Sequence, residues 1–221
     1  MAVIIVGGMI GLGKSSVAKI LGEALDSQVF YESVDDNPIL PLFYTSTKEE
    51  IEKNRYPFLL QLYFLDTRFK AIKQALVNKN NIIDRGIYED VFFCKMNMEF
   101  GKLIGENRVT DLEWQIYKGL FDNMMEELDE LPKKAPDLMV YLKGDFEKTV
   151  LPRIKGRGRE YELDPELVEY YRFLWSHYDE WIENHYKASD ILVIDMDTMD
   201  VVNSVEDRNA LVELVISKLD Y

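Results

Sequence analysis

Residues 8–15, Gly8-Met9-Ile10-Gly11-Leu12-Gly13-Lys14-Ser15, decide the fold of this chain. They match the pattern G-x-x-x-x-G-K-[ST], in which glycines let consecutive backbone N–H groups turn inward toward phosphate oxygens. An apolar run at residues 3–6 precedes the motif, and a helical pattern follows it from about Ser15. A strand before the loop and a helix after it are the context that a phosphate cradle requires. We therefore predict that this phosphate-binding loop (P-loop) holds a nucleotide.

The motif assigns a chemical task to each of its polar residues. Lys14 can reach the β- and γ-phosphates, and the Ser15 hydroxyl can ligate Mg²⁺. The positive N-terminal end of the following helix adds to the attraction for phosphate. The predicted phosphate-binding set consists of Gly8, Gly11, Gly13, Lys14, Ser15 and Ser16.

Short apolar runs alternate with helical patterns along the rest of the chain. The predicted strands are residues 3–6, 28–31, 82–83, 138–142 and 191–194. The first predicted helix starts at about residue 15 and the last one at residue 204. Between them, helices are predicted over residues 56–77, about 110–130 and about 165–187. Two helices have clear start signals, the Thr110/Glu113 capping box and the pair Asp164-Pro165. The alternation predicts one α/β domain, residues 1–221, with a five-stranded parallel sheet covered by helices on both faces.

The charge balance is strongly acidic. Forty Asp and Glu residues against 26 Lys and Arg give a formal net charge of -14. Such a surface repels polyanions, so we expect neither polymeric nucleic acid nor a membrane as partner. The single cysteine, Cys94, lies in an apolar stretch and is expected to be a packing residue. The N-terminal apolar run is too short to span a bilayer and lacks basic leader residues, so we expect a soluble cytoplasmic protein.

Charged residues follow two of the predicted strands. Glu32 comes after the second strand, and Asp84 and Arg85 come after the third. Ligands of open α/β sheets bind outside the carboxyl ends of the strands. One carboxylate there can serve a metal ion, and another can accept the proton of an attacking hydroxyl. A GTPase would need an Asn-Lys-x-Asp segment, which the sequence lacks. The pattern therefore favours a kinase that acts on a small hydroxyl substrate.

Four further segments make the interpretation specific. They are residues 32–38 (Glu-Ser-Val-Asp-Asp-Asn-Pro), 61–68 (from Gln61 to Arg68), 84–90 (Asp-Arg-Gly-Ile-Tyr-Glu-Asp) and 153–159 (Arg-Ile-Lys-Gly-Arg-Gly-Arg). In this order, and together with the P-loop, they resemble the deoxynucleoside kinase family, in particular its bacterial deoxyadenosine/deoxyguanosine kinase branch. The resemblance covers essentially the whole chain. It implies transfer of the γ-phosphate of ATP, with Mg²⁺, to the 5′-hydroxyl of a purine deoxynucleoside, and leaves adenine against guanine open.

The resemblance also implies roles for individual residues. Glu32 would receive the 5′-hydroxyl proton, and Arg85 would hold that hydroxyl and the transferring phosphoryl group, with Lys14 completing the catalytic set. Asp84, beside the substrate, and Ser15 would serve the metal. The remaining roles are Gln61 at the base edge, Arg68 with Asp90 beside the base, Tyr44 and Glu162 at the 3′-hydroxyl, and Arg153, Arg157 and Arg159 as a phosphate-clamping lid over about residues 153–162. Because family members are dimers through helix faces, a homodimer is expected, with pairing of unlike subunits left open.

The chain departs from the family's usual pattern at three places. Met9 and Leu12 stand where the P-loop usually has Pro and Ala, and Gly86 replaces a Ser. None of these removes a charged catalytic group. Pro152 falls inside the helix before the lid, where a proline is expected to remove a hydrogen bond and bend the backbone.

Less specific interpretations stay open beside these. A nucleoside monophosphate kinase would need more arginines at its acceptor, whereas Gln61, Tyr44 and Glu162 suit a neutral sugar. A non-catalytic nucleotide-binding regulator would not need the acids and the lid arginines together. The basic run 153–159 could bind nucleic acid, but the acidic net charge favours a phosphate clamp. The two histidines, His177 and His185, lack ligand partners at metal-binding spacing and are expected to be structural.

Overall fold

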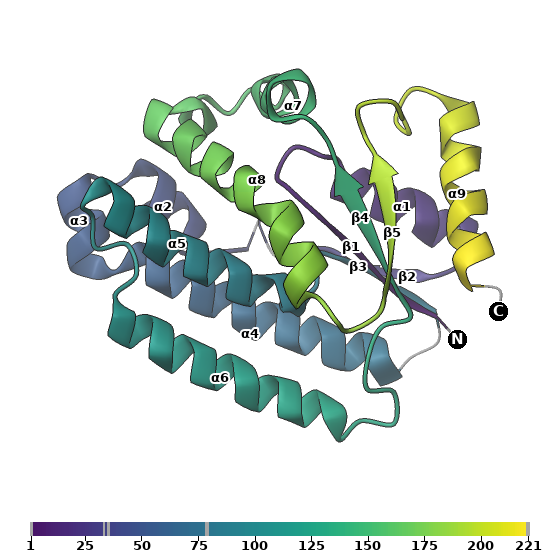
Figure 1. Cartoon of the computed structure of the whole chain (residues 1–221), viewed down its shortest axis with the longest axis horizontal. Helices are drawn as coiled ribbons and strands as arrows, with labels where there is room; N and C mark the ends of the chain where they lie inside the picture. Colours follow the sequence, from purple (N-terminus) through teal and green to yellow (C-terminus); the bar gives the residue numbers. More distant parts are fainter. Residues whose placement is uncertain (1, 33, 35, 78–79, 220–221) are drawn as a thin grey trace.

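The protein is described from a computed structural model that covers residues 2–32, 34, 36–77 and 80–219 (Figure 1). Its strands are β1 (Val3–Gly8), β2 (Gln28–Phe30), β3 (Asn81–Asp84), β4 (Leu138–Lys143) and β5 (Asp190–Asp195). All four strand pairs are parallel, and the order across the sheet is β2-β3-β1-β4-β5. The predicted five-stranded parallel sheet is confirmed, and the strand boundaries differ from the predicted ones by at most two residues at each end.

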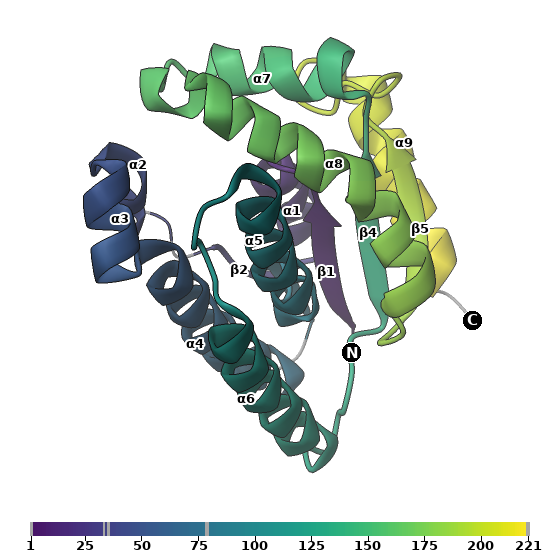
Figure 2. The same cartoon turned by 60° about the vertical axis from the view of Figure 1, so that its left-hand side comes forward.

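Helices cover both faces of the sheet. They are α1 (Lys14–Ala24), α2 (Leu40–Thr45), α3 (Lys48–Asn54), α4 (Tyr56–Val77), α5 (Asp90–Ile104), α6 (Asp111–Asp129), α7 (Leu151–Gly156), α8 (Pro165–His185) and α9 (Val205–Leu219). Helices α1 and α9 pack together on one face, while α4, α5 and α8 lie on the other (Figures 1 and 2). Helix α6 packs outside α4 and α5.

The central strand shows why the sheet is buried. All six residues of β1 are buried, because the strand pairs on both sides and lies beneath helices on both faces. The two predicted helix starts are also observed. Thr110 accepts a hydrogen bond from the Glu113 N–H and forms a complete capping box. Asp164 accepts from the N–H groups of Glu166 and Leu167 at the start of α8.

Two short helices before α4 were not predicted. Helix α2 begins with an apolar run, and α3 is preceded by Thr47, whose side chain caps the helix together with Glu50 in a capping box. The chain leaves α3 through Arg55 at a positive φ of 57°. These helices are too short to show a clear 3.6-residue period, so packing on the cavity side of α4 determines them.

Pro152 does not break a regular helix. A π-helical turn, Phe146–Val150, precedes α7, and Asp145 caps it by accepting from the N–H groups of Glu147 and Lys148. Pro152 then occupies the first turn of α7, where a missing N–H costs little. The expected irregularity is therefore placed just before the proline, in the widened turn.

Candidate active site

A cavity of about 770 Å³ lies at the carboxyl end of the sheet. The P-loop closes one end of it, and side chains from α2, α4, α5 and α8 line the other. The predicted residues that line it are Gly11, Gly13, Lys14, Ser15, Ser16, Glu32, Tyr44, Gln61, Arg68, Asp84, Arg85, Arg157, Arg159 and Glu162. Gly8, Asp90 and Arg153 do not line it. The fold thus brings most of the predicted site residues to the wall of one cavity.

The backbone of the P-loop requires glycine at specific positions. Gly8 has a φ of 133°, and a Cβ there would lie 2.6 Å from the Leu142 carbonyl oxygen. Gly11 has a φ of 87°, and its Cβ would lie 2.9 Å from the Val150 carbonyl oxygen. The loop therefore lies against β4 and the π-helical turn, and a side chain at either position would push it away from them.

Lys14 lies buried inside the loop. Its Nζ donates to the Met9 carbonyl oxygen at 3.1 Å. Burial, with repulsion from Arg85, lowers the pKa of Lys14 to about 7, although Asp84 and Glu32 oppose this. An anion bound in the loop would favour the charged form of this amine.

Ser15 and Asp84 form a pair of oxygen ligands beside the loop. The Ser15 hydroxyl donates to Asp84 Oδ2 at 2.5 Å. Asp84 Oδ1 is buried and has no hydrogen-bond partner among the residues described. Burial raises the pKa of Asp84, and Lys14 and Ser15 oppose the rise. A hydroxyl beside a carboxylate with one free oxygen fits Mg²⁺, which needs few protein ligands when phosphates supply the rest.

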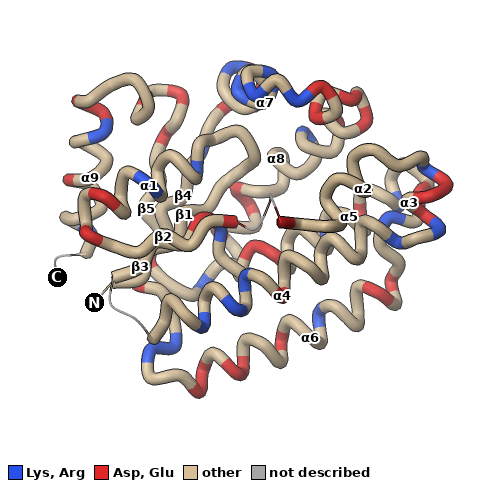
Figure 3. Tube along the Cα trace, turned by 180° about the vertical axis from the view of Figure 1, so that it is seen from behind, with Lys and Arg blue, Asp and Glu red and all other residues tan. Residues whose placement is uncertain are grey.

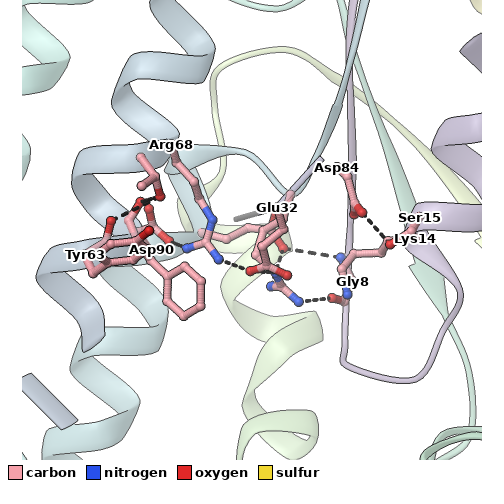
Figure 4. A network of polar contacts seen from close by, with 12 residues as sticks. Gly8, Lys14, Ser15, Glu32, Tyr63, Arg68, Asp84 and Asp90 are labelled. Carbon is pink, nitrogen blue, oxygen red and sulfur yellow. Dashed lines mark hydrogen bonds and ion pairs between the residues drawn. The ribbon is translucent and has the colours of Figure 1, made fainter. Parts of the chain in front are cut away.

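Glu32 lies between two arginines, Arg68 and Arg85, and Figure 4 shows its contact with Arg68. Its Oε1 forms an ion pair with Arg68 Nη2 and lies 3.5 Å from Arg85 Nε. Burial alone would raise the pKa of Glu32, but Arg68, Arg85 and Lys14 outweigh it and lower the pKa to about 2. Glu32 is therefore ionised at all physiological pH values and can accept a hydrogen bond from a substrate hydroxyl.

Arg68 connects Glu32 to Asp90. Its Nη1 pairs with Asp90 Oδ1, and its guanidinium lies 4.4 Å from the centroid of the Phe64 ring. Both Arg68 and Asp90 are buried. Asp90 reaches the cavity only through Arg68, whereas Gln61, seven residues before Arg68 on α4, lines the cavity directly. The predicted Arg68–Asp90 pair is present in the structure.

Arg85 occupies the turn that ends β3. Its backbone has a φ of 67°, which is uncommon for a residue with a side chain. Its Nη2 donates to the Gly8 carbonyl oxygen at 3.0 Å, and its guanidinium lies 4.5 Å from the centroid of the Phe93 ring. The side chain is thereby held between Glu32 and the first turn of the P-loop.

Two of the three predicted lid arginines face the cavity. Glu162 is 1% exposed and lies 3.2 Å from Arg159 Nη1 and 3.5 Å from Arg157 Nη1. Arg153 instead donates to the carbonyl oxygens of Leu12, at 3.4 Å, and Met196, at 3.2 Å. Figure 3 shows Lys and Arg residues concentrated at α7 and just after it. The structure therefore separates Arg153 from the other two arginines, on the outer side of the P-loop.

Tyr44 reaches the lid from α2. Its hydroxyl lies 3.5 Å from the Tyr171 hydroxyl, and its ring centroid lies 4.9 Å from that of Tyr161. Burial raises the pKa of Tyr44 to about 12, so its hydroxyl stays protonated. It can therefore donate a hydrogen bond into the cavity near Glu162.

Two polar residues of the site have no role in the sequence interpretation. Glu89 is buried behind the P-loop, where it contacts Gly8, Arg85 and Tyr178. Glu89 lies within the segment 84–90, but nothing in that segment distinguishes it from a solvated acid. Tyr178 lies in an aromatic stretch of α8 that reads as packing. Only their proximity in three dimensions indicates a role.

Comparison with known proteins identifies the class. The family model for deoxynucleoside kinase matches residues 4–219, so the chain belongs to the deoxynucleoside kinase family. The chain is 46% identical to a deoxyguanosine kinase of Lactobacillus johnsonii, over 99% of this chain and 93% of the relative. It is 42% identical to a deoxyadenosine kinase of Lactobacillus acidophilus, over 98% of this chain and 96% of the relative.

A solved structure agrees with these relatives. The deoxyadenosine kinase from M. mycoides with bound dATP matches with a TM-score of 0.74 and 28% identity, over 99% of this chain and 100% of the other. The sequence-based assignment to this family and the P-loop kinase fold are thus both confirmed. Among the described residues, no helix is long and apolar enough to cross a membrane.

Proposed function

We propose that this enzyme transfers the γ-phosphate of ATP to the 5′-hydroxyl of deoxyadenosine or deoxyguanosine and releases the 5′-monophosphate. The observation that carries the proposal is the position of Glu32. It lies in the same cavity as Lys14 of the P-loop and the Gln61 amide, so a hydroxyl near Glu32 has a phosphate cradle on one side and a base-binding end on the other. Names of the relatives from Lactobacillus support the purine substrates.

The chemistry needs little covalent help from the protein. Glu32 accepts a hydrogen bond from the 5′-hydroxyl and orients it for in-line attack. Because its pKa is held at about 2, it is a weak base and takes the proton late. This suits a loose transition state, in which the attacking oxygen gains little positive charge early. Lys14 and Arg85 stabilise the negative charge on the phosphoryl oxygens.

The metal would sit between the loop and β3. Ser15 and Asp84 would hold Mg²⁺, which would supply positive charge that partly neutralises the phosphate oxygens. Asp84 Oδ1, without a partner in the described part of the chain, is the oxygen available for the ion or one of its waters. Gly11, Gly13 and Ser16 would direct backbone N–H groups and the helix end at the phosphates, while Gly8, whose N–H donates to Glu89, would hold the start of the loop in place.

Recognition of the nucleoside uses neutral and paired groups. The Gln61 amide offers both a donor and an acceptor to a base edge. The Arg68 guanidinium, which lines the cavity and is held by Asp90 behind it, presents a charged surface that purines can meet with hydrogen bonds and thymine, with its methyl group, cannot. Tyr44 and Glu162 would bind the 3′-hydroxyl. We therefore propose deoxyadenosine or deoxyguanosine as best substrate, deoxycytidine as a weaker one and thymidine as poor.

Residues of about 153–162 would form a lid. We propose that Arg157 and Arg159, which line the cavity, leave Glu162 in part to contact the phosphates of ATP. Arg153 is also proposed as a lid arginine, although reaching the phosphates would require it to leave the Leu12 carbonyl. The lid and the sheet would act as parts of one domain, residues 1–221, in a cytoplasmic enzyme without nucleic-acid or membrane partners.

A homodimer is proposed through α4 and α6. Leu112, Ile116 and Leu120 are exposed at four-residue spacing along α6, so they form an apolar stripe on one helix face. Helices α4 and α6 pack side by side on the outer surface (Figure 2). Light scattering at micromolar concentration should give twice the chain mass of 25.9 kDa, and a monomer would contradict the proposal.

The acceptor can be tested in one assay. With ATP and Mg²⁺, deoxyguanosine and deoxyadenosine should each yield a 5′-monophosphate, and their monophosphates should yield no diphosphate. Phosphorylation of the monophosphates in preference to the nucleosides would indicate a nucleoside monophosphate kinase. Absence of ADP with every nucleoside would indicate a nucleotide-binding regulator.

A further inference from the structure

Glu89 is the most deeply buried carboxylate near the P-loop that the proposed mechanism does not use. It is 0% exposed and lies in the short 3₁₀ turn Ile87–Glu89 that follows β3. Its Oε1 accepts from the Gly8 N–H at 3.3 Å, from Arg85 Nη1 at 3.3 Å and from the Tyr178 hydroxyl. One carboxylate oxygen therefore joins the phosphate loop, the arginine of the reaction centre and helix α8.

The other oxygen explains a glycine outside the phosphate motif. Glu89 Oε2 has no hydrogen-bond partner among the described residues. A Cβ built at Gly7 would lie 3.3 Å from this oxygen and 3.3 Å from Met139 Cε. Burying a carboxylate with an unpaired oxygen is unfavourable unless a positive charge lies nearby. For Glu89, the Arg85 guanidinium supplies that charge.

The contacts of Arg85 show which groups the ion pair with Glu89 holds in place. Nη2 donates to the Gly8 carbonyl oxygen, Nη1 to Glu89, and Nε faces Glu32. Glu89 binds the N–H of the same Gly8 whose carbonyl oxygen binds Arg85. The guanidinium and Gly8, the first residue of the P-loop, are thus held to one another twice, once directly and once through Glu89.

We propose that Glu89, with Tyr178, is a positioning residue for phosphoryl transfer. It fixes the Arg85 guanidinium against the P-loop, so that Arg85 meets the transferring phosphoryl group and the 5′-hydroxyl in one orientation. Glu89 itself contacts neither substrate, since it does not line the cavity. The inference rests on the proposed function, because it assigns to Arg85 the role given above.

The first test is Glu89→Gln, which keeps the shape but removes the charge. Loss of orientation at Arg85 should lower kcat about 10- to 100-fold, while KM for ATP and for the nucleoside stays within about three-fold. Tyr178→Phe removes only one donor to Glu89 and should lower kcat about three- to ten-fold. It also serves if the glutamine variant does not fold.

Asp179→Asn is the matched control. Asp179 accepts a hydrogen bond from the Tyr141 hydroxyl at 2.6 Å and pairs with Lys143 Nζ at 2.5 Å, and within the described part of the chain it has no polar contact with Arg85 or the P-loop. Its kcat should stay within two-fold of that of the wild type. An equal loss in Asp179→Asn would show that any disturbed carboxylate–tyrosine pair on α8 has this effect, and would overturn the inference.

A double-mutant cycle separates positioning from stability. In an Arg85→Lys background, adding Glu89→Gln should change kcat less than three-fold, because the group that Glu89 positions is already gone. Multiplicative losses, or an unchanged kcat with a lower melting temperature in Glu89→Gln, would overturn the inference. Wild-type enzyme that phosphorylates no nucleoside would instead refute the proposed function, so the two failures are distinguishable.

Discussion

The phosphate end and the nucleoside end of the cavity are built in different ways. At the phosphate end, one continuous loop and the residues at the end of β3 supply the polar groups, and buried strands fix their backbone. At the nucleoside end, Tyr44, Gln61 and Glu162 come from α2, α4 and the turn before α8. The geometry of the phosphate end therefore depends on backbone conformation, and that of the nucleoside end depends on how separate helices pack.

This difference teaches which properties can change independently. Changes at the phosphate end should lower the rate for every nucleoside by the same factor, because all share the same transferring group. Changes at the nucleoside end should alter the ratio between nucleosides. Glu32 and Arg68 join the two ends by an ion pair, so they mark the boundary where both effects meet.

Lys14→Ala should have the largest effect. Loss of this amine should abolish transfer to all four deoxynucleosides alike while leaving the fold intact, because Lys14 stabilises charge that develops in the transition state. ADP release measures this. Lys19→Ala on the same helix, where Lys19 is exposed and lies 3.9 Å from Glu23, is the control and should leave the rate unchanged. Activity of Lys14→Ala within a few-fold of the wild type would refute the P-loop assignment.

Glu32→Gln should cause the second-largest loss of kcat. Glutamine keeps the shape but cannot take the proton, and loss of a general base costs about 10²–10⁴-fold. The comparison should use kcat at saturating nucleoside, with Glu166→Gln at the start of α8 as a carboxylate control away from the P-loop. A near-normal kcat in Glu32→Gln would mean that Glu32 is structural, or that the transition state needs no base there.

The sequence predicted the phosphate end because its determinants are local. The motif 8–15, the buried run before it and the residues after β3 are each readable within a few positions. It also predicted the sheet and the helices α1, α4, α6, α8 and α9, whose apolar spacing is clear. Helices α2 and α3 were missed, because their short segments gain stability from packing rather than from a periodic pattern.

Polar contacts between distant segments were harder to predict. Glu89 pairs with Tyr178, which is 89 positions away, and no local pattern connects the two. Arg153 shares a basic run with Arg157 and Arg159, but α7 turns it toward Met196 instead of the cavity. The basic run thus predicts that several charged residues lie near one another. The direction in which each side chain points depends on the helix that carries it.

Asp90→Ala should have a smaller effect, confined to selectivity. Without this carboxylate, Arg68 loses one ion-pair partner and keeps Glu32, so its guanidinium is held less firmly in the position from which it disfavours thymine. We expect the kcat/KM ratio of purine deoxynucleoside to thymidine, about 10- to 100-fold in the wild type, to narrow. Asp66→Ala, an exposed acid on α4, should leave it unchanged. An unchanged ratio in Asp90→Ala would assign selectivity to another group.

The smallest expected effect is the uptake of a proton by Lys14 when ATP binds. Because the pKa of free Lys14 is about 7, the amine is mostly neutral at pH 8. Phosphate oxygens favour its charged form, so ATP binding at pH 8 should take up close to one proton and weaken as pH rises further. Calorimetric titrations in two buffers of different ionisation enthalpy measure the uptake. Equal uptake in Lys14→Ala would show that another group titrates.

The most direct test of the central claim is kcat/KM for the four deoxynucleosides with ATP and Mg²⁺. The two ends of the cavity together predict the highest value for deoxyadenosine or deoxyguanosine, a lower value for deoxycytidine and a value at least about 10-fold below the best for thymidine. A highest kcat/KM for thymidine would contradict the roles of Arg68 and Asp90 at the nucleoside end, and no turnover with any of the four would contradict the proposed reaction itself.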